Sequence, residues 1–333
     1  MSMSIESIGV VGAGSWGTAL AINAARAGRR VILWGRDADA ARAMERSREN
    51  ARYLPGIPLD PAIRITADFA ETANADAILL VVPAQTVGEV AGNLSQRSQP
   101  VAVCAKGLDR SSDRRLSEVV REAAPGRPVA AFSGPNFARE VALGLPAAAT
   151  LACVEEQVGQ MLAASMRHDQ FRLYWTDDLT GAEIGGAVKN VLAIAAGIVM
   201  GRGLGENAKA ALITRGLVEL TRLGEAIGAR RETLMGLSGL GDLLLTAGSL
   251  TSRNMAFGHA IGQGADPVVL QKTGEALVEG VATAKAVVRL ASRYPRVEVP
   301  ICQAVDAILA GDLEIEQAIA ALMSRPLKAE TER

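Results

Sequence analysis

The stretch that decides the fold reads SIGVVGAGSWG, residues 7–17. It opens with a short, mainly apolar run typical of a buried strand, and Gly12, Gly14 and Gly17 follow at once, ahead of a helix-compatible segment. At this spacing the first glycine permits a tight turn, the second lets the backbone approach a pyrophosphate, and the third lets the helix pack on the strand. The helix N-terminus then faces the anion. The stretch predicts a dinucleotide site; the alternative is a glycine turn that serves packing alone.

Apolar runs of the same kind recur through the first half of the chain and predict further buried strands. They lie at 31–34, 77–82, 101–104 and 129–132, and two more candidates lie at 148–154 and 171–175. Strands that alternate with helical segments are typical of a parallel sheet covered on both faces. From Thr180 onward, long Ala/Leu/Ile-rich runs at helical spacing dominate. We expect an α/β protein: a Rossmann-type doubly wound parallel sheet in residues 1–180 and an all-α domain in residues 181–333.

Composition and charge exclude several classes of function. The 333 residues carry a net charge of −1 without a block of like charge, which argues against nucleic acid as a partner. Neither a signal segment nor an integral membrane segment is expected, because the longest apolar run, 191–200, is shorter than the roughly 20 residues that a bilayer requires. The scattered cysteines and histidines predict no metal site and fit a reducing cytoplasm; they are Cys104, Cys153, Cys302, His168 and His259.

The end of the second predicted strand bears on the choice of cofactor. An acidic residue there would bind the ribose 2′-hydroxyl of NAD, but the sequence has Gly35 and Arg36, with Asp37 one position too late. Arginine suits a 2′-phosphate, so NADP is favoured over NAD. The alternative is that Arg36 stacks on the adenine without discriminating. Trp16, inside the glycine loop, could cover the pyrophosphate or pack against the second domain.

Lysines are rare in this chain, with 6 Lys against 29 Arg, and each is a candidate for a task that arginine cannot perform. Lysine can lose its proton in a suitable environment, whereas arginine holds it. Lys106 follows a predicted strand, and the motif SGPNFARE at 133–140 follows the next one. Because open parallel sheets bind ligands at the carboxyl ends of their strands, both loops are expected beside the glycine loop.

A second lysine lies in the apolar helical run GGAVKN, residues 185–190. At helical spacing Lys189 shares a face with glycines and alanines, which leave room for a ligand. The alternative is a lysine that snorkels at a domain boundary. Further on, Asp242 and Thr246 share one helical face at i, i+4, and Arg253 and Asn254 are expected to follow a short polar turn, where they could bind a phosphate or form an ordinary loop.

Taken together, these motifs resemble the bacterial NAD(P)-dependent sn-glycerol-3-phosphate dehydrogenases. The family pattern is matched, in order, by GAGSWGTALA, CAKGL, SGPNFARE, GGAVKN, GENAKAALITRG, GLGDLLLT and SRN, from about residue 8 to 285. The resemblance implies reversible hydride transfer between NAD(P)H and dihydroxyacetone phosphate or sn-glycerol 3-phosphate, a supply of glycerol 3-phosphate for phospholipid synthesis, and a homodimer.

The resemblance also implies roles for individual residues. Lys189 would be the proton donor and acceptor at the C2 oxygen, and Lys106 would contact cofactor and substrate. The substrate pocket would further contain Gly134, Asn136, Asn190, Asp242, Thr246, Ser252, Arg253 and Asn254. The cofactor would contact Gly12, Gly14, Ser15, Trp16, Gly17, Arg36, Lys106, Ala138, Arg253, Leu277 and Glu279. The chain departs from the family pattern at Asn136, where threonine is usual, and at Val281, where an aromatic residue is usual.

Two other functions fit parts of this pattern. A β-hydroxyacid or 6-phosphogluconate dehydrogenase-like reductase also has a helical second domain and an active-site lysine, but its substrate carries a carboxylate. A nucleotide-sensing regulator could keep the Rossmann domain without catalysis. The presence of both Lys106 and Lys189 argues against a regulator of that kind.

Overall fold

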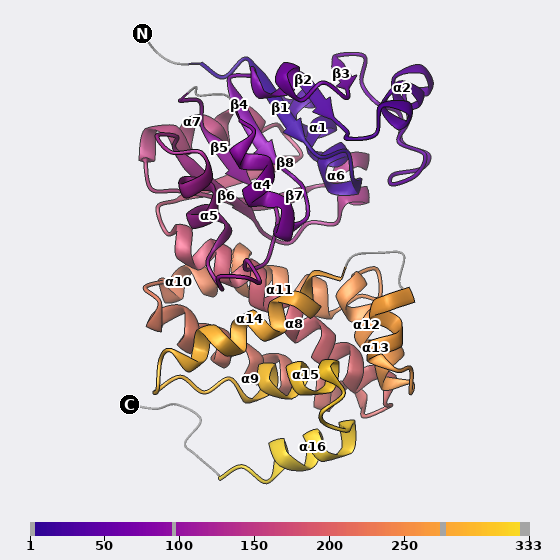
Figure 1. The fold of residues 1–333 in the computed structure, drawn as a ribbon, viewed down its shortest axis with the longest axis vertical. Helices are drawn as coiled ribbons and strands as arrows, with labels where there is room; N and C mark the ends of the chain where they lie inside the picture. The colour runs from indigo at the N-terminus through magenta and orange to yellow at the C-terminus, as the bar shows by residue number, and fades with distance from the viewer. Residues whose placement is uncertain (1–3, 95–97, 274–277, 327–333) are drawn as a thin grey trace.

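The computed structural model describes residues 4–94, 98–273 and 278–326, which form a strand-rich half and a helical half (Figure 1). The strands are β1 Ser7–Val11, β2 Arg30–Trp34, β3 Ile63–Thr66, β4 Ala77–Leu80, β5 Val101–Val103, β6 Val129–Ser133, β7 Ala147–Cys153 and β8 Phe171–Thr176. The first half also contains α1 Ser15–Arg26, α2 Ala38–Ser47, α3 Phe69–Ala73, the 3₁₀ turn η1 Ala84–Thr86, α4 Val87–Gly92, α5 Leu116–Ala123, α6 Ala138–Leu143 and α7 Glu156–Met166. The predicted Rossmann-type α/β class is confirmed.

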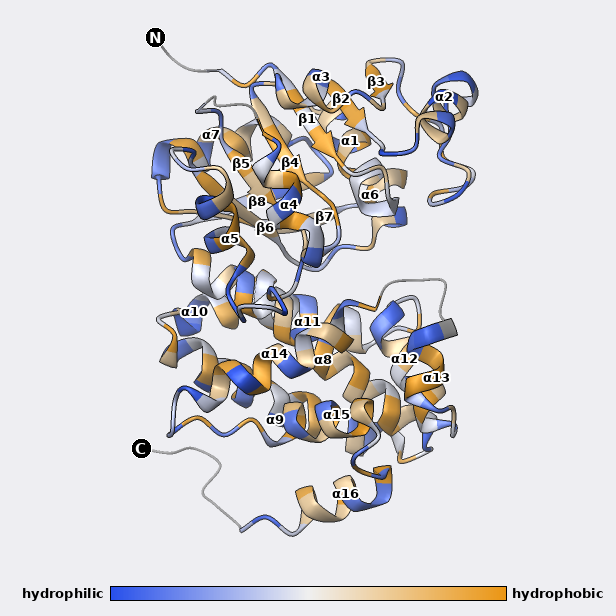
Figure 2. Ribbon diagram, in the orientation of Figure 1, coloured by the Kyte–Doolittle hydropathy of each residue, from blue (hydrophilic) through white to orange (hydrophobic). Residues whose placement is uncertain are grey.

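All eight strands form one sheet in the order β3-β2-β1-β4-β5-β6-β7-β8. One apolar core packs α1, α2, α6 and α7 on one face, and a second packs α3, α4 and α5 on the other. Figure 2 shows the strands β1, β4 and β5 as hydrophobic ribbons between these layers. The order reverses at β1, so the ends of β1 and β4 flank the crevice where such sheets bind ligands.

Two features of the sheet differ from the sequence prediction. β7 runs antiparallel to β6, and β8 runs parallel to β7, so only the first six strands are mutually parallel. A buried apolar run reads the same in either direction, which is why the pattern did not reveal this. β3 was not predicted, because it is a short edge strand in which the exposed Arg64 interrupts the apolar pattern.

The second half is helical, as predicted. It contains α8 Leu179–Gly201, α9 Gly205–Ala226, α10 Arg231–Leu234, the π-helical turn η2 Leu237–Gly241, α11 Asp242–Ala247, α12 Arg253–Gly262, α13 Pro267–Thr273, α14 Glu279–Ser292, α15 Pro300–Ala310 and α16 Ile315–Met323. Arg253 and Asn254 therefore open a helix instead of lying in a loop, since Ser252 caps α12 by accepting a hydrogen bond from the Met255 amide.

Helix α8 is the centre of this half and joins it to the sheet. Its first turns bury Leu179 and Ala182 against Ala131 of β6 and Ala152 of β7. Among the described residues it alone is long and apolar enough to cross a membrane, and it extends well beyond the apolar run noted in the sequence. However, 89% of its most apolar window is buried inside the protein, as in the core helix of a folded domain. Its buried face carries Lys189 to the end of the sheet.

Candidate active site

The glycine loop has the geometry that a dinucleotide requires. A Cβ at Gly12, which has a φ of 119°, would lie 2.5 Å from the Val81 carbonyl oxygen, and one at Gly17 would lie 1.8 Å from the Gly12 carbonyl oxygen. Both glycines are therefore required by the turn and by close packing of α1. Around Gly14, by contrast, nothing lies within 4 Å of such a Cβ. The open space is at the N-terminus of α1, where a pyrophosphate would bind.

Ser15 and Trp16 follow Gly14 in this loop. Ser15 begins α1. The Trp16 ring makes an edge-to-face contact with Phe132 of β6, with centroids 5.9 Å apart. Trp16 thus packs on the core of the strand-rich half.

Arg36 follows β2, and Asp37 next to it is already engaged. The Asp37 carboxylate caps α2 by accepting hydrogen bonds from the amides of Asp39 and Ala40, both at 3.0 Å. These bonds are the main cause that lowers the pKa of Asp37. A carboxylate committed to a helix cap is poorly placed to bind a ribose hydroxyl, whereas Arg36 is exposed at the end of β2. This geometry fits a 2′-phosphate.

The two predicted lysines come from distant segments and meet on one carboxylate. Lys189 Nζ donates to Asp242 Oδ1 at 2.8 Å and to Thr246 Oγ1 at 2.6 Å. Lys106 Nζ donates to Asp242 Oδ2 at 2.6 Å and to the Gly134 carbonyl oxygen at 2.9 Å. Each oxygen of Asp242 therefore holds one ammonium group, and the loops after β5 and β6 converge with α8 and α11 as predicted.

Burial gives this cluster its electrostatic character. Lys189 is 7% exposed and Asp242 is 1% exposed, so the snorkelling alternative for Lys189 was wrong. Desolvation lowers the pKa of Lys189 to about 8; Asp242 opposes this effect, and Lys106 adds to it. Burial raises the pKa of Asp242, but the charges of the two lysines have a larger effect in the opposite direction. The pKa of Asp242 is therefore below its ordinary value. Lys189 can therefore exchange a proton near neutral pH while Asp242 stays ionised.

A second hydrogen-bonded chain links the residue after Lys189 to α14. Asn254 Nδ2 donates to Asn190 Oδ1 at 3.0 Å, and Asn254 Oδ1 accepts from the Gly280 amide at 3.0 Å. Within the described part of the chain, the buried Asn190 Nδ2 has no partner. It is a free donor beside the lysine cluster, suited to an oxygen of a ligand.

Arg253 and Glu279 add one charge of each sign near the cluster. Burial raises the pKa of Glu279, and the positive charges of Arg253 and the two lysines offset part of that rise. Arg253 itself is exposed at the first position of α12, where its guanidinium can reach an anion. Leu277, the remaining predicted cofactor contact of this region, lies outside the described residues.

Gly134, Asn136 and Ala138 lie between β6 and α6. Gly134 adopts a φ of 136°, and its carbonyl oxygen accepts from Lys106. Asn136 Nδ2 donates to the Ala148 carbonyl oxygen at 3.1 Å, so the amide is bound to β7 and its Oδ1 has no partner among the described residues. Asn136 therefore offers an acceptor as well as a donor. Ala138 begins α6.

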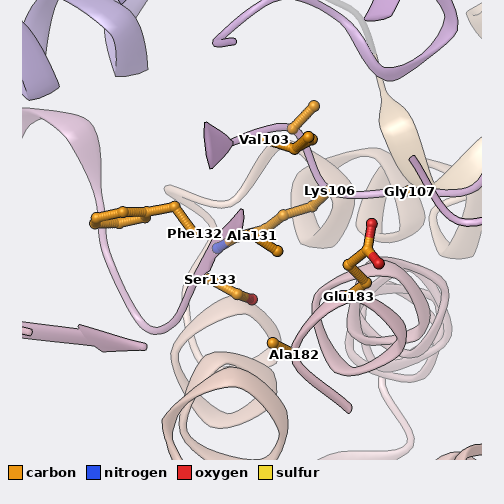
Figure 3. A pocket seen from close by; sticks show the side chains of 9 residues that line it. Val103, Lys106, Gly107, Ala131, Phe132, Ser133, Ala182 and Glu183 are labelled. Carbon is orange, nitrogen blue, oxygen red and sulfur yellow. The ribbon is translucent and has the colours of Figure 1, made fainter. Parts of the chain in front are cut away.

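Figure 3 shows two polar residues beside Lys106 that the sequence analysis did not single out, Ser133 and Glu183. Together with Lys106 they border a small cavity of about 10 Å³. Glu183, on α8, accepts from the amide and the hydroxyl of Ser117, at 2.8 and 2.5 Å, and so fixes the start of α5. The signal that identified Lys189, a charged residue in an apolar helical run, applies equally to Glu183.

Comparisons with known proteins agree over nearly the whole chain. Two family profiles match, NAD-dependent glycerol-3-phosphate dehydrogenase N-terminus at residues 7–159 and C-terminus at residues 178–320. Glycerol-3-phosphate dehydrogenase [NAD(P)+] of Rhodospirillum rubrum is 51% identical over 334 residues, covering 99% of this chain and 95% of that protein. Its counterpart in Methylobacterium radiotolerans is 53% identical over 335 residues, covering 99% and 100%.

A solved structure agrees as well. The crystal structure of glycerol-3-phosphate dehydrogenase from Coxiella burnetii has a TM-score of 0.91 at 40% identity, covering 96% of this chain and 99% of that one. These matches favour the predicted family over the hydroxyacid dehydrogenase alternative. With the family profiles and the two relatives above half identity, they show that the chain belongs to the NAD-dependent glycerol-3-phosphate dehydrogenase family.

Proposed function

We propose that this protein is an NAD(P)-dependent glycerol-3-phosphate dehydrogenase, which interconverts dihydroxyacetone phosphate and sn-glycerol 3-phosphate. The observation that carries the proposal is the buried Lys189–Asp242–Lys106 cluster at the carboxyl ends of β5 and β6, on the same edge of the sheet as the glycine loop. Such a cluster offers both a tunable proton and a fixed positive charge. A ketone reductase needs these two functions.

The cofactor would be held by the open space at Gly14 and the first turn of α1, with Ser15, Trp16, Arg36, Ala138 and Glu279 as further contacts. When bound, NAD(P)H supplies the hydride that adds to the C2 carbon of dihydroxyacetone phosphate. As negative charge grows on the C2 oxygen, the Lys189 ammonium stabilises it and donates its proton. In the reverse direction neutral Lys189 accepts the proton of the C2 hydroxyl.

The neighbours of Lys189 hold it in place for that transfer. Asp242 and Thr246 fix the orientation of its amine by accepting two of its three hydrogen bonds, which leaves the third for the substrate oxygen. Lys106 lies on the other oxygen of Asp242, where its amine can bind substrate and cofactor. Ser252 keeps α12 capped, and Arg253, Asn254 and Asn190 offer donors for the substrate's phosphate and hydroxyl oxygens.

The reaction can be tested by following NADPH oxidation with dihydroxyacetone phosphate, unphosphorylated dihydroxyacetone and 2-keto acids, and NADP+ reduction with 3-hydroxy acids. We expect turnover with dihydroxyacetone phosphate and a value of kcat/KM at least about 10²-fold lower without the phosphate, because the charged hydrogen bonds to it are lost. Preference for an unphosphorylated acid would contradict the proposed function and favour the hydroxyacid alternative.

Arg36 carries the proposed preference for NADP. Replacing it by aspartate, Arg36→Asp, is expected to lower the NADPH/NADH ratio of kcat/KM by at least about 10-fold, because a charged hydrogen bond of about 1.5 kcal/mol is lost and a repulsive charge is added. Arg46→Asp changes the net charge equally at an exposed position in the last turn of α2 and serves as the control. An unchanged ratio in Arg36→Asp would mean that Arg36 does not read the 2′-phosphate.

Three broader features belong to the same proposal. We infer a division near residue 180, with nucleotide binding in residues 1–180 and substrate binding in residues 181–333; the start of α8 at Leu179 supports it. The protein would act in the cytoplasm as a homodimer and supply glycerol 3-phosphate for phospholipid synthesis. Size-exclusion chromatography with light scattering tests the dimer directly.

A further inference from the structure

The segment 107–115 belongs to the strand-rich half by sequence but packs into the helical half. Leu108 is fully buried in the apolar core that α8, α14 and α15 share. Gly107, with a φ of 154°, passes so close to α14 that a Cβ there would lie 3.3 Å from Thr283 Oγ1. On the other side, Gln85 Nε2 donates to the Leu108 carbonyl oxygen at 2.9 Å, so contacts with both halves set the backbone immediately after Lys106.

This segment is held together by its own hydrogen bonds. The Asp109 amide donates to the Arg114 carbonyl oxygen at 2.9 Å, and the Asp113 amide donates to the Asp109 carbonyl oxygen at 2.8 Å. The Asp109 carboxylate accepts from the Ser112 amide and hydroxyl at 2.9 and 2.7 Å. A compact loop of this kind moves as a unit, so a restraint at its far end acts on Lys106.

Asp113 provides that restraint. Its side chain is 7% exposed, and its carboxylate accepts from Arg289 Nε of α14 at 2.8 Å and from Nη2 of Arg293, the C-cap of α14, at 2.8 Å. Arg289 also donates to the carbonyl oxygen of Arg110. Asp113 adopts a φ of 58°, a left-handed conformation that costs an aspartate less than most residues. Two arginines thus clamp the loop to the helix whose first turn hydrogen-bonds Asn254.

We propose that Asp113 is a positioning residue for Lys106: its ion pairs with Arg289 and Arg293 fix the loop on α14 and so hold the Lys106 ammonium between Asp242 and the Gly134 carbonyl oxygen. The inference rests on the proposed function, in which Lys106 binds the substrate. It explains why a lysine from the sheet meets a carboxylate from α11. Without the clamp, the loop would keep the burial of Leu108 and the Gln85 hydrogen bond but would lose its ion pairs with α14.

The test is a double-mutant cycle between Asp113→Gly and Lys106→Met. Glycine suits the left-handed backbone, so Asp113→Gly removes the carboxylate without adding strain. We expect Asp113→Gly alone to lower kcat/KM for dihydroxyacetone phosphate by about 10- to 100-fold, the effect of a misplaced catalytic-site group. In the Lys106→Met background the same change is expected to alter kcat/KM by less than about 2-fold, because no ammonium is left to position.

Hydrogen–deuterium exchange gives a readout that does not depend on turnover. Amides of 107–115 are expected to exchange faster in Asp113→Gly and in Arg289→Ala, while α8 stays protected. Arg325→Ala, which breaks a surface pair with Glu298, is the matched control and should change neither the exchange of this loop nor kcat/KM. If Asp113→Gly does not fold, Arg289→Ala and Arg293→Ala replace it in the cycle.

The possible failures are distinguishable. Near-normal kcat/KM in Lys106→Met would overturn the role of Lys106 in the proposed function. A strong effect of Lys106→Met with normal kcat/KM in Asp113→Gly would overturn the positioning role alone. Equal losses from Asp113→Gly with and without Lys106 would also overturn it, since they would show that the clamp serves general stability.

Discussion

Replacing Lys189 by methionine is expected to lower kcat by about 10²- to 10⁴-fold while leaving the Kd for NADPH nearly unchanged. Methionine preserves much of the buried volume of the lysine stem but supplies neither the proton nor the charge at the C2 oxygen. Lys189 donates its hydrogen bonds to Asp242 and Thr246. Both residues lie outside the glycine loop and α1, which would hold the cofactor. Steady-state kinetics and NADPH fluorescence titration measure the two quantities.

Two matched variants sharpen this prediction. Lys189→Arg keeps a positive charge but holds its proton at any accessible pH, so it should also be slower than wild type by at least about 10²-fold. Lys272→Met removes an exposed lysine on α13 and should leave kcat unchanged. Turnover near the wild-type value in Lys189→Met would refute the proton-transfer role.

The change Asp242→Asn is expected to damage both activity and stability. Each oxygen of Asp242 accepts a hydrogen bond from one lysine. The asparagine side chain has only one oxygen that can accept, so at least one lysine loses its hydrogen bond. We expect kcat/KM to fall by about 10²-fold. The free energy of unfolding at pH 7 is expected to fall by about 3 kcal/mol, because removing one partner leaves buried charge uncompensated.

The pH dependence of that stability loss identifies its cause. Asp242 raises the pKa of Lys189, so its stabilising effect is present while Lys189 is protonated and is lost as the pH rises through about 8. The difference between wild type and Asp242→Asn in chemical denaturation should therefore shrink as the pH rises toward about 8 and level off above it. Asp177→Asn, which breaks an exposed pair with Arg230, should leave the free energy of unfolding nearly unchanged. A loss that is independent of pH would point to packing instead of charge.

Much of the fold was predictable because it depends on local patterns. Short runs of consecutive residues are enough to predict the buried strands and the glycine turn at residues 7–17. The same holds for the change to helical periodicity near Thr180. The direction of β7 was not predictable, because an apolar strand carries no mark of its direction. The sequence suggested a loop at Arg253, because Ser252, the N-cap of α12, lies in a Ser/Thr-rich stretch that also resembles a turn.

The residues of the lysine cluster could be singled out from the sequence, but the hydrogen bonds that join them could not. Lysine in an arginine-rich chain and the family motifs singled out Lys106, Lys189 and Asp242. That one carboxylate binds both lysines is a property of three segments meeting in space. Asp113 could not be singled out from the sequence, where it is one of several charged residues in a polar segment. Its burial and its ion pair with Arg289 of α14 are visible only in the structure.

Proton exchange by Lys189 is tested by measuring kcat/KM in both directions between about pH 7 and pH 10. We expect the rate of reduction to be constant up to about pH 8 and then to fall about tenfold per pH unit, because Lys189 must be protonated to donate. The rate of oxidation should rise up to about pH 8 and then level off, because Lys189 must be neutral to accept. Profiles without opposed breaks near pH 8 would contradict proton exchange by Lys189.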